Sequence, residues 1–127
     1  MKILIVEDNP ANMKLVSDLL KREGHVILEA LDADAGIALA KTEVPALILM
    51  DIQLPGMDGV SALKILKQDE KTRRIKTIAL TALAMSGDKE RLLGAGFDSY
   101  MSKPIRYKEL LQAVAALLNQ EDGNVAT

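Results

Sequence analysis

Short apolar segments rich in β-branched residues alternate along the chain with longer segments whose apolar residues recur at helical spacing. The apolar segments occupy residues 2–6, 25–30, 46–50 and 75–81, with a weaker one at 98–102. Continuous apolar character over about five residues is typical of a strand buried on both faces. Alternation of such strands with helices predicts a parallel sheet covered on both sides. The chain is therefore expected to be an α/β protein.

The helical segments carry recognisable boundary residues. Asn9-Pro10 supplies a cap and a first-turn proline for a helix that Gly24 ends. Asp32 and Asp58 can cap the helices that follow the second and third strands, and Pro104 is expected to open the last helix. A further helix is expected over about residues 88–94.

Length and composition restrict the class of protein. A chain of 127 residues is long enough for one domain with its own core; we expect it over residues 1–120, followed by a polar, disordered tail at 121–127. A net charge of −2 with 2% aromatic residues argues against direct nucleic-acid binding. The absence of cysteine excludes disulfides, thiolate nucleophiles and cysteine-ligated zinc.

No targeting or membrane signal is visible in the sequence. The opening KILIVED is too short and too soon charged for a signal peptide. No apolar run approaches the roughly 20 residues that a spanning helix needs. The expectation is a cytoplasmic protein without a membrane partner.

Polar residues collect where the predicted strands end. In an open parallel sheet, ligands bind beyond the carboxyl ends of the strands. The first strand ends in Glu7-Asp8, the third in Asp51, the fourth in Thr81 and the fifth in Ser102-Lys103-Pro104. Taken singly, each has an ordinary structural explanation, such as a helix cap or a solvated lysine. Their placement along one edge of one sheet indicates a functional site.

Three carboxylates on adjacent loops repel one another unless something lies between them. Two unit charges about 4 Å apart cost about 4 kcal/mol at the effective dielectric of a protein surface. Either a shared proton or a bound hard cation would relieve that repulsion, and three oxygen donors with room for water suit Mg²⁺ better than Ca²⁺. His25, the only histidine, is expected in the second strand and leaves zinc without ligands.

At this point the motifs resemble those of a known family over nearly the whole chain. IVEDN, LILMDIQLPGMDG, ALTA and DSYMSKP, in this order and spacing, are similar to the motifs of response-regulator receiver domains of bacterial two-component signalling. The resemblance implies a flavodoxin-like, three-layer fold with a doubly wound sheet of strand order 2-1-3-4-5 and five helices. It also implies that Asp51 accepts a phosphoryl group.

The resemblance further implies a metal site at the same place. Mg²⁺, with Mn²⁺ able to replace it, would be held by Asp8, Asp51 and the backbone carbonyl of Gln53, and Glu7 would act through bound water.

Other site residues follow from the same resemblance. Lys103 would contact the phosphoryl group, and Thr81 and Tyr100 would form the switch. On sequence alone, Tyr100 is equally well explained as a half-buried strand aromatic. The Lys103-Pro104 bond would be cis, which is the conformation of only about 5–6% of X-Pro bonds in folded proteins.

Because no phosphate-binding loop of the type GxxxxGK[ST] is present, the phosphoryl group must come from elsewhere. The resemblance implies a phosphohistidine of a sensor kinase or of a histidine phosphotransfer protein as donor, with small acyl phosphates as substitutes. It implies a downstream protein target, and a monomer or weak phosphorylation-dependent dimer. The domain would catalyse only its own phosphorylation and dephosphorylation and would not otherwise be an enzyme.

Several interpretations remain at the level of sequence. The preferred one is a single-domain regulator of the cell-division type, with which the chain shares MDIQLP. A receiver of a hybrid kinase or phosphorelay would instead pass the phosphate onward. An aspartate-nucleophile phosphatase is disfavoured because Ile52-Gln53 follows Asp51, where that class has an aspartate two residues on. A flavin-binding module is disfavoured because, in the absence of metal, Glu7-Asp8 would repel a phosphate. The Arg73-Arg74 pair is interpreted as part of a solvent-exposed face.

Overall fold

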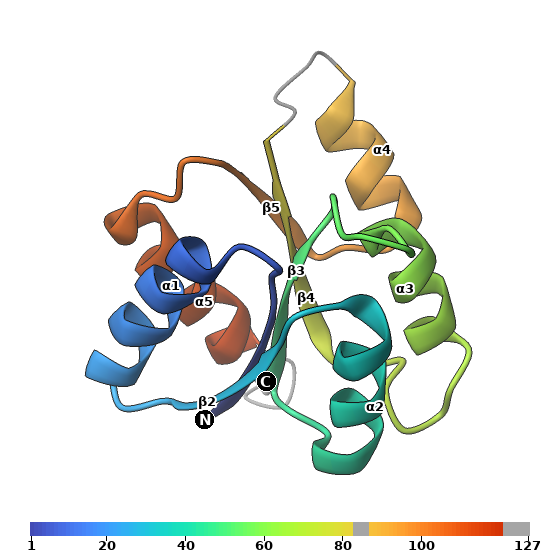
Figure 1. Cartoon of the computed structure of the whole chain (residues 1–127), viewed down its shortest axis with the longest axis horizontal. Coiled ribbons are helices and arrows are strands. Elements are labelled where there is room, and N and C mark those ends of the chain that lie inside the picture. The colour runs from blue at the N-terminus through green and yellow to red at the C-terminus, as the bar shows by residue number, and fades with distance from the viewer. Residues whose placement is uncertain (83–86, 121–127) are drawn as a thin grey trace.

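A parallel sheet of five strands in the order β2-β1-β3-β4-β5 forms the middle layer of the protein (Figure 1). Its strands are β1 (Lys2–Val6), β2 (Val26–Ala30), β3 (Leu47–Asp51), β4 (Lys76–Thr81) and β5 (Ser99–Ser102). The computed structural model describes residues 1–82 and 87–120, so the tail expected at 121–127 lies outside the described residues. The predicted fold class and strand order are confirmed.

Helices cover both faces of the sheet (Figure 1). They are α1 (Pro10–Arg22), α2 (Ala33–Glu43), α3 (Gly59–Lys67), α4 (Asp88–Ala95) and α5 (Tyr107–Gln120). Helices α1 and α5 lie on one face, and α2, α3 and α4 lie on the other. Within the described parts of the chain, none of these helices has the length and apolar character needed to cross a membrane.

Strand β1 shows why a continuous apolar run is needed in the centre of such a sheet. Successive side chains of a strand point to opposite faces. Ile3 and Ile5 pack in the core beneath α1 and α5, whereas Leu4 and Val6 pack in the core on the α2 and α3 side. All four side chains are fully buried. Both faces of the central strands are therefore apolar, as the sequence predicts.

The expected helix caps are formed by side chains at the starts of three helices. Oxygens of Asn9, Asp32 and Asp58 each accept a hydrogen bond from the backbone N–H three residues further on, over 2.8–3.0 Å. Each cap supplies a partner for one N–H that the helix itself leaves unbonded, which is worth about 1 kcal/mol.

The last helix begins later than the sequence suggests, and the assignment of Pro104 as its first residue is wrong. The Lys103 N–H donates to the Thr81 carbonyl over 2.8 Å, so the chain continues the strand pairing past the end of β5. The Lys103-Pro104 bond is cis, and α5 begins only at Tyr107. Pro104 therefore belongs to the turn after β5.

Gly59, at the start of α3, holds the loop after β3 against the helix. Its N–H donates to the Ile52 carbonyl over 2.9 Å, and a Cβ at this position would lie 2.6 Å from the Asp51 carbonyl oxygen and 2.9 Å from the Ile52 Cα. We expect Gly59→Ala to lower the free energy of unfolding by about 2 kcal/mol, because backbone atoms must move to admit the methyl group. Urea unfolding measures this loss.

Gly94→Ala is the matched control for that substitution. Gly94 lies inside α4, and a Cβ there would meet nothing within 4 Å. Alanine should raise the free energy of unfolding by up to about 1 kcal/mol through helix propensity alone. Equal effects of the two substitutions would contradict a tight contact between Gly59 and the end of β3.

Candidate functional site

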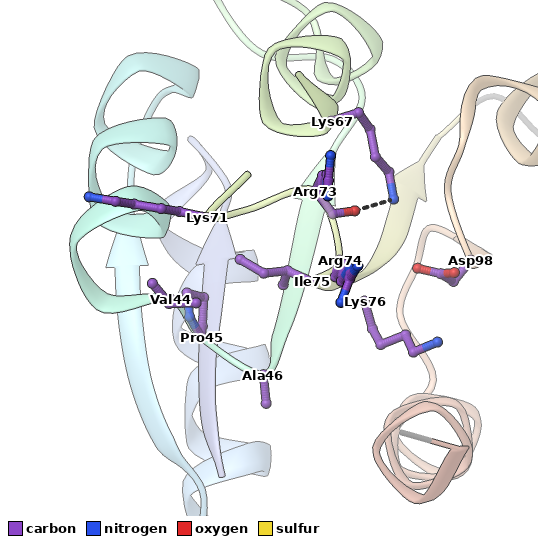
Figure 2. A pocket seen from close by; sticks show the side chains of 10 residues that line it. All are labelled: Val44, Pro45, Ala46, Lys67, Lys71, Arg73, Arg74, Ile75, Lys76 and Asp98. Atoms are coloured by element: carbon purple, nitrogen blue, oxygen red, sulfur yellow. Dashed lines mark hydrogen bonds between the residues drawn. The ribbon is translucent and has the colours of Figure 1, made fainter. Parts of the chain in front are cut away.

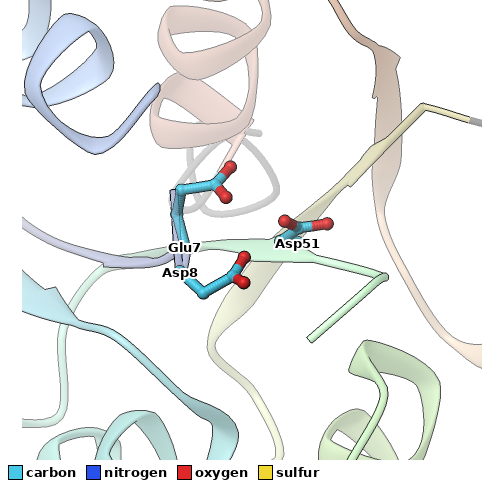
Figure 3. A group of neighbouring side chains, drawn as sticks. All are labelled: Glu7, Asp8 and Asp51. Atoms are coloured by element: carbon cyan, nitrogen blue, oxygen red, sulfur yellow. The ribbon is translucent and has the colours of Figure 1, made fainter. Parts of the chain in front are cut away.

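Three acidic side chains meet at the carboxyl edge of the sheet (Figure 3). Glu7 and Asp8 follow β1, and Asp51 ends β3, which pairs directly with β1. One oxygen from each carboxylate lies within 4.8 Å of the others. The structure thus brings together the three carboxylates that were predicted to meet at the ends of the first and third strands.

The three carboxylates differ in their exposure to water. Glu7 and Asp51 are each only 1% exposed, whereas Asp8 is exposed. Glu7 Oε2 accepts the Asn9 N–H over 3.1 Å, but Glu7 Oε1 is buried and accepts no hydrogen bond. A buried oxygen that accepts no hydrogen bond is costly, so this atom depends on a nearby cation.

Lys103 is the counterion of the two buried carboxylates. Its Nζ donates to Asp51 Oδ2 over 2.8 Å and lies 2.9 Å from Glu7 Oε1, an ion pair whose direction of approach does not satisfy hydrogen-bond geometry. The lysine side chain is 17% exposed. Burial opposes its charge, but its contacts with Asp51 and Glu7 outweigh burial and raise the pKa of Lys103.

Asp51 is held in place at both of its carboxylate oxygens. Oδ1 accepts the backbone N–H of Gln53 over 2.9 Å, and Oδ2 accepts the Lys103 ammonium. The chain then turns away through Pro55-Gly56, where Gly56 has a φ of 83° that other residues rarely adopt. A rigid strand therefore presents this carboxylate in a fixed orientation at the edge of the sheet.

Glu7 is the acid whose protonation is altered most clearly by the site. Burial raises the pKa of Glu7, and the neighbouring Asp51 adds to the rise, while the contacts with Lys103 and the Asn9 N–H oppose it. The deprotonated form of Glu7 is consequently less favourable in the folded protein than in the unfolded chain.

This raised pKa predicts how stability depends on pH in the presence of a metal chelator. An acid with a raised folded pKa contributes stability that is complete below its unfolded value, about 4.3 for glutamate, and is lost as pH rises through the folded value. Glu7→Gln imitates the protonated acid, so urea unfolding in EDTA should show a smaller loss of stability on raising the pH in this variant. Identical pH dependence in variant and parent would contradict the prediction.

Thr81 and Tyr100, the two residues predicted to form a switch, lie on β4 and β5. Thr81 ends β4 and is fully buried, one residue beyond Leu80, the register partner of Asp51. Tyr100, on β5, is half-buried and packs against the core on the α2, α3 and α4 side. Thr81 thus lies one residue past the position paired with Asp51, and Tyr100 lies on the next strand of the sheet.

The donor set at this edge suits a hard divalent cation. It consists of carboxylate oxygens, one of which is a buried atom lacking a hydrogen-bond partner. Such ligands favour a hard cation such as Mg²⁺ over softer metals. The three acids could be predicted from the sequence, but the position of Lys103 between two of them could not. In the structure its ammonium relieves much of the repulsion expected between Glu7 and Asp51.

Comparisons with known proteins support the same interpretation. The sequence profile of the response regulator receiver domain matches residues 3–115. The chain is 42% identical to the polar-differentiation response regulator DivK of Brucella ovis over 116 residues, covering 91% of this chain and 94% of that protein. The relative is named a response regulator, in agreement with the resemblance of the sequence motifs.

Solved structures of receiver domains superpose closely on the chain. The receiver domain of the sensor histidine kinase PA1611 from Pseudomonas aeruginosa PAO1 is 36% identical, with a TM-score of 0.86 over 93% of this chain and 97% of that one. That structure has a magnesium ion coordinated in its active-site cleft. The receiver domain of the Francisella response regulator 1452 is 28% identical, with a TM-score of 0.87 over 94% and 97% of the two chains.

Proposed function

The chain belongs to the response regulator receiver family, which acts in two-component signalling, and we propose that its phosphoryl acceptor is Asp51. The observation that carries the proposal is the position of this carboxylate. It ends a buried central strand, lies within the acidic cluster and contacts the Lys103 ammonium. A carboxylate is a competent nucleophile for phosphoryl transfer when the charge of the transferring group is neutralised.

Receiver domains bind Mg²⁺ at an acidic site, and the residues of this chain fit that ion. We propose that Asp8, Asp51 and the backbone carbonyl of Gln53 hold it and that Glu7 acts through a bound water. Glu7 Oε1, which is buried and accepts no hydrogen bond, supports this assignment. When bound, Mg²⁺ neutralises charge on the phosphoryl oxygens. Mn²⁺, which has similar ligand preferences, is proposed to substitute for it.

Lys103 is proposed to contact the phosphoryl oxygens after transfer. Its present contact with Asp51 Oδ2 places the ammonium next to the nucleophile, so a short movement would bring it to the new oxygens. Thr81 is proposed to supply the switching hydroxyl and Tyr100 the aromatic side chain that changes position. The support for Thr81 is its burial one residue past the partner of Asp51.

Receiver domains take their phosphoryl group from histidine kinases or phosphotransfer proteins and act on downstream targets. We propose that this domain does so in the cytoplasm, as a single-domain regulator that binds a protein target. The 94% coverage of the DivK relative supports this role. We further propose that it is a monomer or a weak dimer formed on phosphorylation, and that it catalyses only its own phosphorylation and dephosphorylation.

A second candidate function is that of a phosphorelay intermediate, which passes its phosphoryl group to another histidine. The observation that favours it is the 36% identity to a receiver domain of a sensor histidine kinase. Phosphoryl transfer from the labelled domain to a histidine phosphotransfer protein, faster than hydrolysis, would favour this role over that of a terminal regulator.

The experiment that tests the proposed function uses acetyl phosphate as donor. With Mg²⁺ present, intact-protein mass spectrometry should show addition of one phosphoryl group, which hydroxylamine removes because the product is an acyl phosphate. EDTA should prevent the addition. Absence of labelling with Mg²⁺, or a label that resists hydroxylamine, would overturn the proposal.

A further inference from the structure

A cavity with basic residues in its lining lies at the amino edge of the sheet (Figure 2). Its volume is about 600 Å³. Ala46 precedes β3 and Asp51 ends it, so at about 3.3 Å per strand residue the cavity and the acidic cluster are roughly 17 Å apart. The cavity is lined by the turn after α2, the end of α3, the segment leading into β4, and the residue before β5: Val44, Pro45, Ala46, Lys67, Lys71, Arg73, Arg74, Ile75, Lys76 and Asp98.

The cavity carries far more positive than negative charge. Five of its residues are lysine or arginine and one is a carboxylate, Asp98, whose oxygen accepts the Thr77 N–H over 2.8 Å. Within residues 1–82 and 87–120, none of the five basic side chains forms an ion pair with a carboxylate. This concentration of charge occurs on a chain whose net charge is −2. Because like charges repel, a multivalent anion bound here would be favoured.

The loop that carries the two arginines is fixed by its own hydrogen bonds. The Thr72 hydroxyl donates to the Leu66 carbonyl over 2.6 Å, and the Arg73 N–H donates to the Asp69 carbonyl over 2.9 Å. Lys67 Nζ in turn donates to the Arg73 carbonyl over 3.2 Å, the contact drawn in Figure 2. Solvated lysines on mobile loops are ordinary features of a surface. Here the backbone that positions the arginines is already ordered, which reduces the cost of binding.

The cavity also has an apolar wall. Ile75 and Pro45 are buried, and Val44 is 49% exposed. Val44 has a φ of 42°, in the left-handed region that a β-branched residue rarely adopts and that costs on the order of 1–3 kcal/mol. Glycine would cap α2 at this position without strain. The strained valine therefore presents apolar surface beside the basic groups at the expense of stability.

From these features we propose that the cavity binds a phosphorylated organic anion of about the size of a nucleotide. The volume falls within the range of roughly 300–1,000 Å³ that is typical of small-molecule sites. Arginine guanidinium groups match phosphate oxygens in pairs, and the lysines add charge. The wall of Val44, Pro45 and Ile75 would receive the organic moiety. An acidic protein segment would use the charges but would leave the apolar wall unexplained.

The proposal is tested by isothermal titration of the full chain with ATP, in EDTA so that no metal bridges ATP to the acidic cluster. Inorganic triphosphate and a short poly-glutamate peptide are titrated in parallel. ATP should bind more tightly than either. The variant Arg73→Glu/Arg74→Glu should weaken ATP binding more than tenfold, whereas Lys21→Glu/Arg22→Glu, an equally charged change at the end of α1, should leave it within about twofold.

Val44→Gly separates the apolar wall from the charges. It should weaken ATP binding several-fold, leave triphosphate binding unchanged and keep or raise the melting temperature, because the strain at this residue is relieved. Thermal melts and labelling by acetyl phosphate confirm that each variant is folded, since none of these residues lies near Asp51.

Four results would overturn the proposal. They are no ATP binding at about 1 mM, equal binding of ATP and triphosphate, tighter binding of poly-glutamate than of ATP, and equal losses in the two charge-reversed variants. The third would identify an acidic protein segment as the occupant, and the last would show attraction by overall charge alone.

Discussion

Replacement of Asp51 by asparagine should abolish phosphorylation of the protein by acetyl phosphate and Mg²⁺. The amide of asparagine lacks the anionic oxygen that attacks phosphorus, so no slower version of the same step remains. The fold should persist, because the asparagine oxygen can still accept the Gln53 N–H that Asp51 Oδ1 accepts at 2.9 Å. Intact-protein mass spectrometry after a fixed incubation measures the loss.

Asp69→Asn provides the matched control, because it makes the same chemical change at the other end of the sheet. Asp69 Oδ1 accepts the Lys71 N–H over 2.8 Å in the loop before β4, and asparagine can preserve that bond. This variant should be labelled like the parent. Equal labelling of the two variants, at any level, would mean that Asp51 has no special part in the reaction.

The second large effect is expected at Lys103, whose replacement by methionine removes the ammonium but keeps most of the side-chain stem. We expect phosphorylation to slow by about 10²- to 10³-fold, which is typical for loss of one group that stabilises developing charge. The metal-free protein should also lose about 3 kcal/mol of stability, because the buried Glu7 and Asp51 carboxylates lose the cation that contacts both.

Magnesium binding by this variant should move in the opposite direction. With the lysine charge removed from contacts of 2.8 and 2.9 Å, the acidic cluster attracts a divalent cation more strongly, so the dissociation constant for Mg²⁺ should fall by about tenfold or more. Titration of Mg²⁺ followed by melting temperature measures it, since a ligand of the folded state raises stability. Weaker Mg²⁺ binding, or an unchanged rate of phosphorylation, would contradict the role of Lys103.

The sequence was most informative about the elements that local patterns determine. KILIV has apolar residues for both faces of the sheet, and the structure buries Ile3 and Leu4 in separate cores. The error at Pro104 has a physical reason. Proline is favoured both in the first turn of a helix and in turns, and only the continuation of strand pairing at Lys103, a contact distant in sequence, decides between them.

The difference between local patterns and contacts distant in sequence also explains which parts of the site could be predicted. Because parallel strands share one carboxyl edge, the meeting of Glu7, Asp8 and Asp51 follows from strand ends alone. The bridge from Lys103 to two of these acids depends on how the fifth strand aims a long side chain. The basic cavity joins α3, the loop after it and the start of β4, so the Arg73-Arg74 pair, read alone, gave no sign of it.

The most direct test of the account is to identify the residue that carries the phosphoryl group. Sodium borohydride reduces an aspartyl phosphate to homoserine, which marks the phosphorylated position permanently. After labelling with acetyl phosphate and Mg²⁺, tandem mass spectrometry of the digested protein should find homoserine at residue 51 and nowhere else. Its appearance at Asp8, or an unreduced Asp51 in fully labelled protein, would contradict the assignment of Asp51 as the phosphoryl acceptor.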